Sequence, residues 1–222
     1  MEVKTKLEEI ISNIEAASHR SNRNSEDVNV IAVTKYVSVE RAKEAVEAGI
    51  THLGENRQEG LVEKVAAFEH QPVWHFIGTL QSRKVKDVID HVDYIHSLDR
   101  RSLAKEINKR ATKKVKCFVQ VNVSGEESKH GLAVEQVMPF VESLENYPNI
   151  EVVGLMTMAP HIKDPDEIRF VFKKLRELRT SIQERSFDYA PCKELSMGMS
   201  NDYEIAVEEG ATFVRIGSSL VG

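Results

Sequence analysis

A lysine directly after an apolar run is the residue in this chain best suited to covalent chemistry. Lys35 follows the segment VIAVT, residues 30–34, which has the pattern of a buried strand. A lysine at the rim of an apolar core loses hydration, and this favours the neutral amine over the ammonium ion. Because a neutral amine attacks an aldehyde to form an imine, Lys35 is a candidate for holding a carbonyl compound. The alternative is a surface lysine that pairs with Glu55 or Asp99.

Two loops late in the chain have the composition of a phosphate site. The segment SMGMSND, residues 196–202, leads from an apolar run into a predicted helix, with Ser200 as the expected N-cap. The segment RIGSS, residues 215–219, follows the last apolar run, where Gly217 permits a ligand to approach the backbone and Ser218 offers an amide and a hydroxyl. Free amides of this kind bind phosphate. Each loop alone is typical of an ordinary turn, but together they favour a phosphate site.

The elements that would position these residues alternate between strand and helix patterns. Eight short β-type runs recur, and several are nearly continuous in apolar residues, as in strands buried on both faces of a parallel sheet. The runs cover residues 29–34, 52–54, 73–78, 94–98, 116–123, 151–156, 194–197 and 213–217. Eight such units can close into a barrel or stay open as a doubly wound sheet, and their number favours closure. We therefore predict an α/β fold, a single (β/α)₈ TIM barrel that occupies residues 1–222.

The segments between the runs carry signals for helix starts and stops. Ser38 is an expected N-cap, and Gly49 stands where that helix should end. Asp164 followed by Pro165 predicts the start of another helix, with proline at the first helical position. The last predicted helix covers residues 201–209.

An additional amphipathic helix is predicted before the first strand, over residues 2–18. Its apolar face would combine Leu7, Ile10, Ile11 and Ile14. We expect this helix to cover the barrel where a final helix would otherwise lie.

Composition excludes several classes of function. The chain has 222 residues, a formal net charge of −5 and no basic footprint for nucleic acid. It contains neither a signal peptide pattern nor an apolar run of the roughly 18 residues that a membrane span needs. The two cysteines, Cys117 and Cys192, lie far apart, which is typical of reduced thiols in a cytoplasmic protein. The eight histidines show neither HxH nor HExxH spacing, so we expect no metal site.

A parallel barrel places its chemistry at the carboxyl ends of the strands. The residues at or just after the eight runs are Lys35, Glu55, Asn56, Thr79, Asp99, Ser124, Thr157, Ser200 and Ser218. We expect the polar segment over residues 124–131 to be a solvated turn near the mouth of the barrel.

With these positions assembled, the chain resembles the pyridoxal phosphate homeostasis proteins (the YggS/PROSC family) over nearly its whole length. The segments that carry the resemblance are AVTKYV around Lys35, HLGENRQE, WHFIGTLQSRK, VNVSGEESKHGL, GLMTMAP, LSMGMSNDY and FVRIGSSL. One departure is Thr79, where the family pattern has histidine.

The resemblance implies a barrel like the N-terminal domain of alanine racemase, with pyridoxal 5′-phosphate (PLP) as its cofactor. Carried over by matching motif, Lys35 would hold PLP as a Schiff base. Ser200, Gly217 and Ser218 would hold its phosphate, in agreement with what their positions alone suggest.

Two further roles rest on the resemblance alone. Arg215 would face the pyridine nitrogen, and Asn56 would line the pocket beside the ring.

We therefore expect a PLP-binding protein of vitamin B6 and amino-acid homeostasis that lacks robust turnover. Its expected partners are PLP, free amino acids and PLP-accepting apo-enzymes, and a monomer is expected rather than a dimer. One alternative is a PLP-dependent amino-acid racemase, although such enzymes carry a second domain with a tyrosine base and this chain ends at Gly222. Another is a barrel enzyme that acts on sugar phosphates without PLP.

Overall fold

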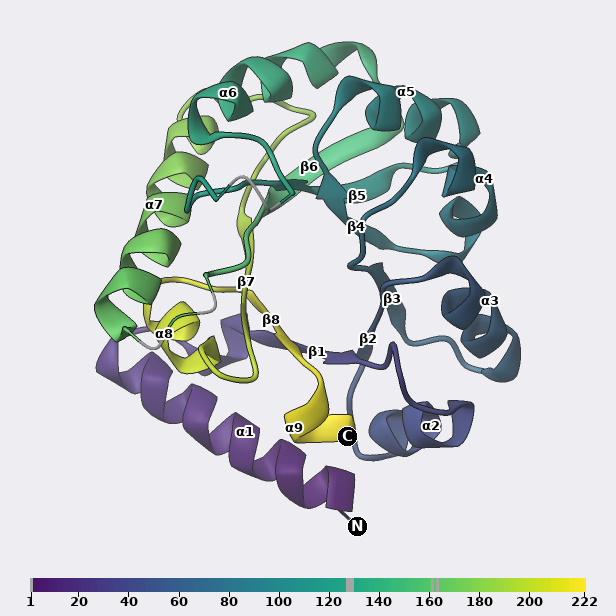
Figure 1. Cartoon of the computed structure of the whole chain (residues 1–222), viewed down its shortest axis with the longest axis vertical. Coiled ribbons are helices and arrows are strands. Elements are labelled where there is room, and N and C mark those ends of the chain that lie inside the picture. Colours follow the sequence, from purple (N-terminus) through teal and green to yellow (C-terminus); the bar gives the residue numbers. More distant parts are fainter. Residues whose placement is uncertain (1, 127–129, 161, 163) are drawn as a thin grey trace.

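The computed structural model describes residues 2–126, 130–160, 162 and 164–222. Strands and helices alternate along the chain, and the helices form a ring around the strands (Figure 1). The strands are β1 Asn29–Val33, β2 His52–Glu55, β3 Val73–Phe76, β4 Tyr94–Leu98, β5 Val115–Gln120, β6 Ile150–Met156, β7 Glu194–Met199 and β8 Phe213–Ile216. The helices are α1 Glu2–Arg20, α2 Val39–Glu47, α3 Gln58–Ala67, α4 Val85–Val88, α5 Arg101–Arg110, α6 Val134–Glu142, α7 Pro165–Gln183, α8 Tyr203–Glu208 and α9 Ser218–Val221. Short 3₁₀ turns occur at Ser25–Asp27, Ser82–Lys84, Ile89–His91 and Ser143–Asn146.

The eight strands form a closed parallel barrel in which β1 pairs with β2 on one side and with β8 on the other. The predicted TIM barrel is therefore confirmed, and the doubly wound sheet is excluded. The strand bounds agree with the predicted runs to within three residues. The largest difference is at β5, which ends at Gln120, since Val121 pairs with Leu132 in an isolated bridge outside the strand.

The apolar core has two parts, one outside the barrel wall and one inside it. The larger part joins the outward faces of the strands to the buried faces of the helices. The smaller part fills the barrel interior with Ile31, Phe118, Val153, Met156 and Phe213. The barrel is thus a packed core rather than a pore, and only its ends are open to ligands.

The predicted helix signals were confirmed at α2 and α7 but not at α8. Ser38 Oγ accepts a hydrogen bond from an amide of the first turn of α2, and Gly49 has a φ of 107° beyond its end. Asp164 caps α7 in the same way, with Pro165 at the first helical position. The last predicted helix is shorter than expected, since α8 begins at Tyr203 rather than at residue 201.

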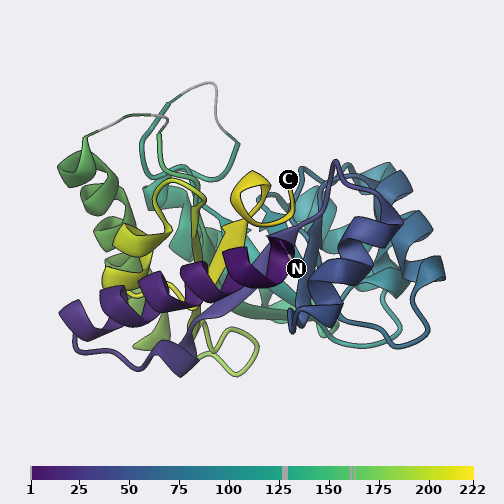
Figure 2. The same cartoon turned by 90° about the horizontal axis from the view of Figure 1, so that it is seen from below.

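The leading helix α1 lies along the outside of the barrel (Figures 1 and 2), where it contacts α8, α9 and α2. It thus covers the wall as predicted. Leu7, Ile10 and Ile14 are buried, but Ile11 is 42% exposed, so its placement on the apolar face was wrong. One residue of a helix turns the side chain by roughly 100°, and this carries Ile11 away from Ile10 towards solvent. No helix within the described residues is long and apolar enough to span a membrane.

Candidate functional site

A cavity of about 680 Å³ lies at the carboxyl ends of the strands. All six residues that the sequence singled out for a cofactor line it: Lys35, Asn56, Ser200, Arg215, Gly217 and Ser218. They come from the loops after β1, β2, β7 and β8 and from β8 itself. Thr79, the departure from the family pattern, also lies in the lining, so the loop after β3 belongs to the same site.

Lys35 is not the ion-paired surface lysine of the alternative interpretation. Glu55 is fully buried and its Oε1 pairs with Lys64 Nζ at 2.9 Å, while Asp99 Oδ1 pairs with Arg100 at 2.6 Å. Both proposed carboxylate partners of Lys35 are therefore committed elsewhere.

The surroundings of Lys35 differ in one respect from the expectation. Its side chain is exposed, so protein atoms alone do not remove its hydration, and Nζ lies 4.9 Å from the ring centroid of Tyr36. Its backbone position is nevertheless fixed, because the preceding Thr34 donates a buried 2.6 Å hydrogen bond from Oγ1 to Glu55 Oε1. The amine thus stands on a rigid strand end and faces the cavity with an accessible nitrogen.

Asn56 follows Glu55 and lies tightly against the loop after β3. A Cβ on Gly78 would stand 2.2 Å from the Asn56 carbonyl oxygen, so only glycine allows this approach. Asn56 Oδ1 is buried and has no hydrogen-bond partner within the described residues. This oxygen in the cavity wall is therefore available to a polar group of a ligand.

The loops after β7 and β8 are joined through Ser200, but not through helix capping. Ser200 Oγ accepts from the Gly217 amide at 3.4 Å and lies 2.9 Å from Ser219 Oγ. The prediction that Ser200 caps the following helix was wrong, because the residue before α8 is Asp202. Asp202 Oδ1 accepts from the Met199 amide at 2.5 Å, and this turn separates Ser200 from the helix.

These two loops nevertheless offer the donors that a phosphate needs. Ser218 and Ser219 are exposed and open the short helix α9, whose first amides have no acceptor within the helix. An ideal Cβ on Gly217 meets only Val33 within 4 Å, so the backbone here is open to a ligand. Together with Ser200, these residues provide hydroxyl and amide donors at one end of the cavity.

Arg215 supplies a buried cation at the wall of the cavity. The residue is 5% exposed, and its guanidinium donates to Ser196 Oγ at 2.6 Å and to the Thr157 carbonyl at 3.0 Å. Burial lowers the pKa of Arg215 to about 10, which still leaves the group charged at neutral pH.

Three histidines form a hydrogen-bonded column beneath Arg215, inside the barrel. Ser196 Oγ lies 2.9 Å from His96 Nδ1, His96 Nε2 lies 2.8 Å from His75 Nδ1, and His75 Nε2 lies 2.9 Å from His52 Nδ1. Ser196 Oγ accepts from Arg215 and can donate its proton to His96 Nδ1, an arrangement in which each ring carries its own proton on Nε2. Burial holds the pKa of His75 and of His96 well below the usual value, so both rings are neutral.

The histidine column was missed by the sequence reading, which treated His75 only as a core residue. Motif searches look for histidines a few residues apart, whereas these come from three successive strands, β2, β3 and β4. The sequence signal that could have revealed the column is one histidine in each of three neighbouring predicted strands. No group of three His, Cys, Asp or Glu residues in the described part of the chain could hold a metal ion.

Two other residues predicted at the carboxyl ends of the strands, Thr157 and Ser124, do not line this cavity. Thr157 is buried and donates to the Val121 carbonyl, and Ser124 lines a different cavity, beside α7. Residues 127–129 of the polar segment after β5 lie outside the described residues. The sequence reading also missed several lining residues, including Tyr36, Ile77, Gln120, Met158 and Asn201.

Comparison with known proteins shows which family this chain belongs to. The model of the family "Alanine racemase, N-terminal domain" matches residues 5–222. A curated relative from Aquifex aeolicus (strain VF5), named "Pyridoxal phosphate homeostasis protein", is 41% identical over 221 residues, which cover 98% of this chain and 96% of the relative.

Solved structures agree with this assignment. A protein of unknown function from Bifidobacterium adolescentis is 34% identical, with a TM-score of 0.90 over 99% of this chain and 94% of that one. PipY from Synechococcus elongatus PCC7942, solved with PLP bound, is 30% identical, with a TM-score of 0.84 over 99% of this chain and 100% of PipY. The chain therefore belongs to the alanine racemase N-terminal domain family, among its pyridoxal phosphate homeostasis proteins.

Proposed function

We propose that this protein binds PLP through a Schiff base on Lys35 and acts in intracellular vitamin B6 and amino-acid homeostasis without robust turnover. The observation that carries the proposal is one cavity with an accessible amine at Lys35, a buried cation at Arg215 and clustered hydroxyls at Ser200 and Ser218. The relative named for pyridoxal phosphate homeostasis and the PLP-bound PipY structure support it.

The lining fits the parts of PLP one by one. Gly217, Ser218 and Ser200 offer amide and hydroxyl donors to a phosphate, and hydrogen bonds to an ionised group are stronger than neutral ones. Asn56 adds an unsatisfied polar group for a ring substituent. When bound, PLP supplies an aldehyde that reacts with amines and an electron sink for carbanions.

Arg215 limits what the site can do with that electron sink. Its guanidinium only donates hydrogen bonds and cannot take up a proton. At this end of the cavity the protein therefore offers a fixed cation, held by Ser196 and Thr157, and no carboxylate that would keep a ring nitrogen protonated.

The remaining groups of the cavity favour a carrier over a racemase. Racemisation needs proton transfer on both faces of the substrate carbon, and each face needs its own acid or base. The cavity lining contains no carboxylate, histidine or cysteine side chain among the described residues. Lys35 and Tyr36 are its groups suited to proton transfer, and they lie together, with Nζ 4.9 Å from the ring centroid. No observation favours the racemase or a sugar-phosphate enzyme.

Racemase assays with alanine and serine, together with solvent deuterium exchange at Cα, test the absence of turnover on PLP-saturated protein. We expect rates far below those of typical enzymes. Turnover of about 1–10³ per second would contradict the carrier proposal and favour the racemase.

The remaining parts of the proposal concern location and partners. Cys117 and Cys192 are free and buried, and burial raises the pKa of the Cys192 thiol to about 12, in keeping with reduced structural thiols in the cytoplasm. We propose that residues 1–222 act as a single PLP-binding domain and as a monomer. Free amino acids and PLP-accepting apo-enzymes are its proposed partners.

A further inference from the structure

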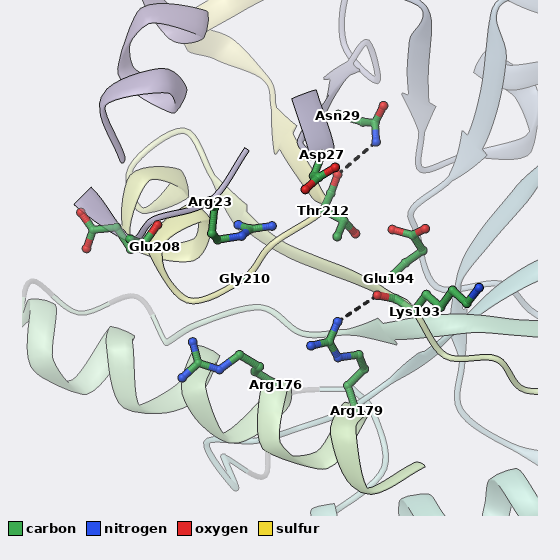
Figure 3. A pocket seen from close by; sticks show the side chains of 11 residues that line it. Arg23, Asp27, Asn29, Arg176, Arg179, Lys193, Glu194, Glu208, Gly210 and Thr212 are labelled. Atoms are coloured by element: carbon green, nitrogen blue, oxygen red, sulfur yellow. Dashed lines mark hydrogen bonds between the residues drawn. The ribbon is translucent and has the colours of Figure 1, made fainter. Parts of the chain in front are cut away.

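A second cavity, of about 620 Å³, lies at the end of the barrel where the strands begin. Its wall includes Asn29 and Glu194, the first residues of β1 and β7, whereas the Lys35 cavity lies at the carboxyl ends of the strands. Figure 3 shows three arginines around it: Arg23 from the segment after α1, and Arg176 and Arg179 from α7. The two cavities therefore occupy opposite faces of the molecule.

Arg23 and Arg179 use only part of their hydrogen-bonding capacity. Arg23 donates to the carbonyls of Val207 and Ala211, near the end of α8. Arg179 donates from one terminal nitrogen to the Lys193 carbonyl at 2.9 Å, a bond drawn in Figure 3, but its buried Nε has no acceptor. Within the described part of the chain, neither guanidinium forms an ion pair with a carboxylate. A buried N–H without an acceptor is costly, so a ligand that accepts from it is favoured.

Other charges near the cavity are already paired. Arg176 pairs with Glu209 at 2.9 Å, and Glu208 accepts from Arg20 and Arg169 at 2.6 Å each. Within these ion pairs the positive and negative charges offset each other. The net charge of the cavity therefore depends on its other charged side chains.

The remaining charges form a half-buried cationic centre with an acidic edge. Arg23 and Arg179 are half-buried, and burial lowers the pKa of both, while the Asp27 carboxylate opposes this shift at Arg23. Lys193, Asp27 and Glu194 complete the charged lining. Two guanidinium groups that line one cavity, with open donors and no ion-paired carboxylate among the described residues, are suited to bind an anion.

We propose that this cavity is a binding site for a small oxyanion, a carboxylate or phosphate group that accepts hydrogen bonds from Arg179 Nε and from Arg23. Planar guanidinium groups match both kinds of oxyanion. Asp27 and Glu194 line the same cavity, so the ligand carries a hydroxyl or ammonium donor beside its oxyanion. Phosphate monoesters and hydroxy or amino acids share this chemistry.

The test is an NMR titration of the arginine Nε–Hε signals on protein that is loaded with PLP at Lys35 and freed of unbound PLP, with inorganic phosphate in one arm and acetate in the other. Saturation with PLP keeps added phosphate away from the Ser200 and Gly217 loops. We expect the Arg179 signal to shift and saturate with at least one anion. A shift with phosphate but not with acetate would identify the ligand group as a phosphate. A shift with acetate but not with phosphate would identify it as a carboxylate.

A calorimetric titration of variants gives the second measurement. Arg179→Gln should weaken binding of the effective anion at least tenfold. Arg110→Gln is the charge-matched control, because Arg110 lies on α5 and, within the described residues, pairs only with Glu106. This variant should bind the anion within twofold of the wild-type affinity.

An Arg179 signal unmoved by both anions would overturn the proposal, as would wild-type affinity in Arg179→Gln. Because the NMR titration uses the wild-type protein, it decides the matter even if the variant does not fold. The Arg179 signal reports on the end of the barrel opposite to the Lys35 cavity. The titration can therefore be interpreted even if PLP does not bind at Lys35.

Discussion

Replacement of Ser196 by alanine would cut the connection between Arg215 and the histidine column. The hydroxyl accepts a 2.6 Å bond from the buried guanidinium and lies 2.9 Å from His96 Nδ1. Loss of a hydrogen bond to a charged group costs about 1.5–3 kcal/mol, and a buried ring nitrogen without its donor about 1–3 kcal/mol. Because Arg215 keeps its bond to the Thr157 carbonyl, we expect a total loss of about 2–5 kcal/mol in the free energy of unfolding.

Urea unfolding at pH 8, where the histidines are neutral, measures this loss. Ser181→Ala is the matched control, since Ser181 is exposed on α7 and its Oγ donates to the Glu177 carbonyl alone among the described residues. The control should change the free energy of unfolding by less than about 0.5 kcal/mol. A loss that small in Ser196→Ala would refute the bridging role of the hydroxyl.

Three further predictions concern the cofactor cavity and the barrel beneath it. Gly217→Val should weaken PLP binding at least tenfold, and pyridoxal binding much less, because the added methyl groups take space from the phosphate; equilibrium titration measures both. Lys64→Met should lower the free energy of unfolding by about 3–5 kcal/mol, because it leaves the fully buried Glu55 carboxylate without its cation. Acid should destabilise the protein below about pH 6.5. His75 and His96 have lowered pKa values in the fold, so the unfolded chain binds more protons there, and each costs about 1.4 kcal/mol per pH unit in urea unfolding.

Each of these predictions has an outcome that contradicts it. If Gly217→Val lowered the affinities for PLP and pyridoxal equally, the phosphate would not bind at that loop. Lys84→Met removes an exposed ion pair with Glu59 and should cost under about 1 kcal/mol, so an equally small loss in Lys64→Met would contradict the buried pair. A free energy of unfolding that stays constant between pH 6.5 and pH 5 would show that the buried histidines take up protons in the fold.

The barrel and the place of Lys35 in the cavity could be predicted because they depend on local pattern. Eight apolar runs separated by helix signals specify a parallel barrel, and the barrel fixes which residues reach its carboxyl end. Lys35, Ser200 and Gly217 were found in this way, since each directly follows a run or lies within one turn of it.

Features that depend on contacts between distant segments could not be read in the same way. Ser200 looks like an N-cap until the Asp202 carboxylate is seen to bond back to the Met199 amide. The histidine column joins residues more than twenty positions apart, and its bonds follow from the depth of each strand in the barrel. Arg23 and Arg179 line the same cavity although the segment after α1 and helix α7 are far apart in the sequence.

Reduction of PLP-saturated protein with borohydride, followed by peptide mapping, tests the central proposal most directly. The cofactor should become fixed to the peptide that contains Lys35, the accessible amine in the cavity at the carboxyl ends of the strands. Lys35→Ala should lose both the reducible chromophore and the label. A label on another peptide, or a Lys35→Ala protein that keeps the same reducible chromophore, would contradict the account.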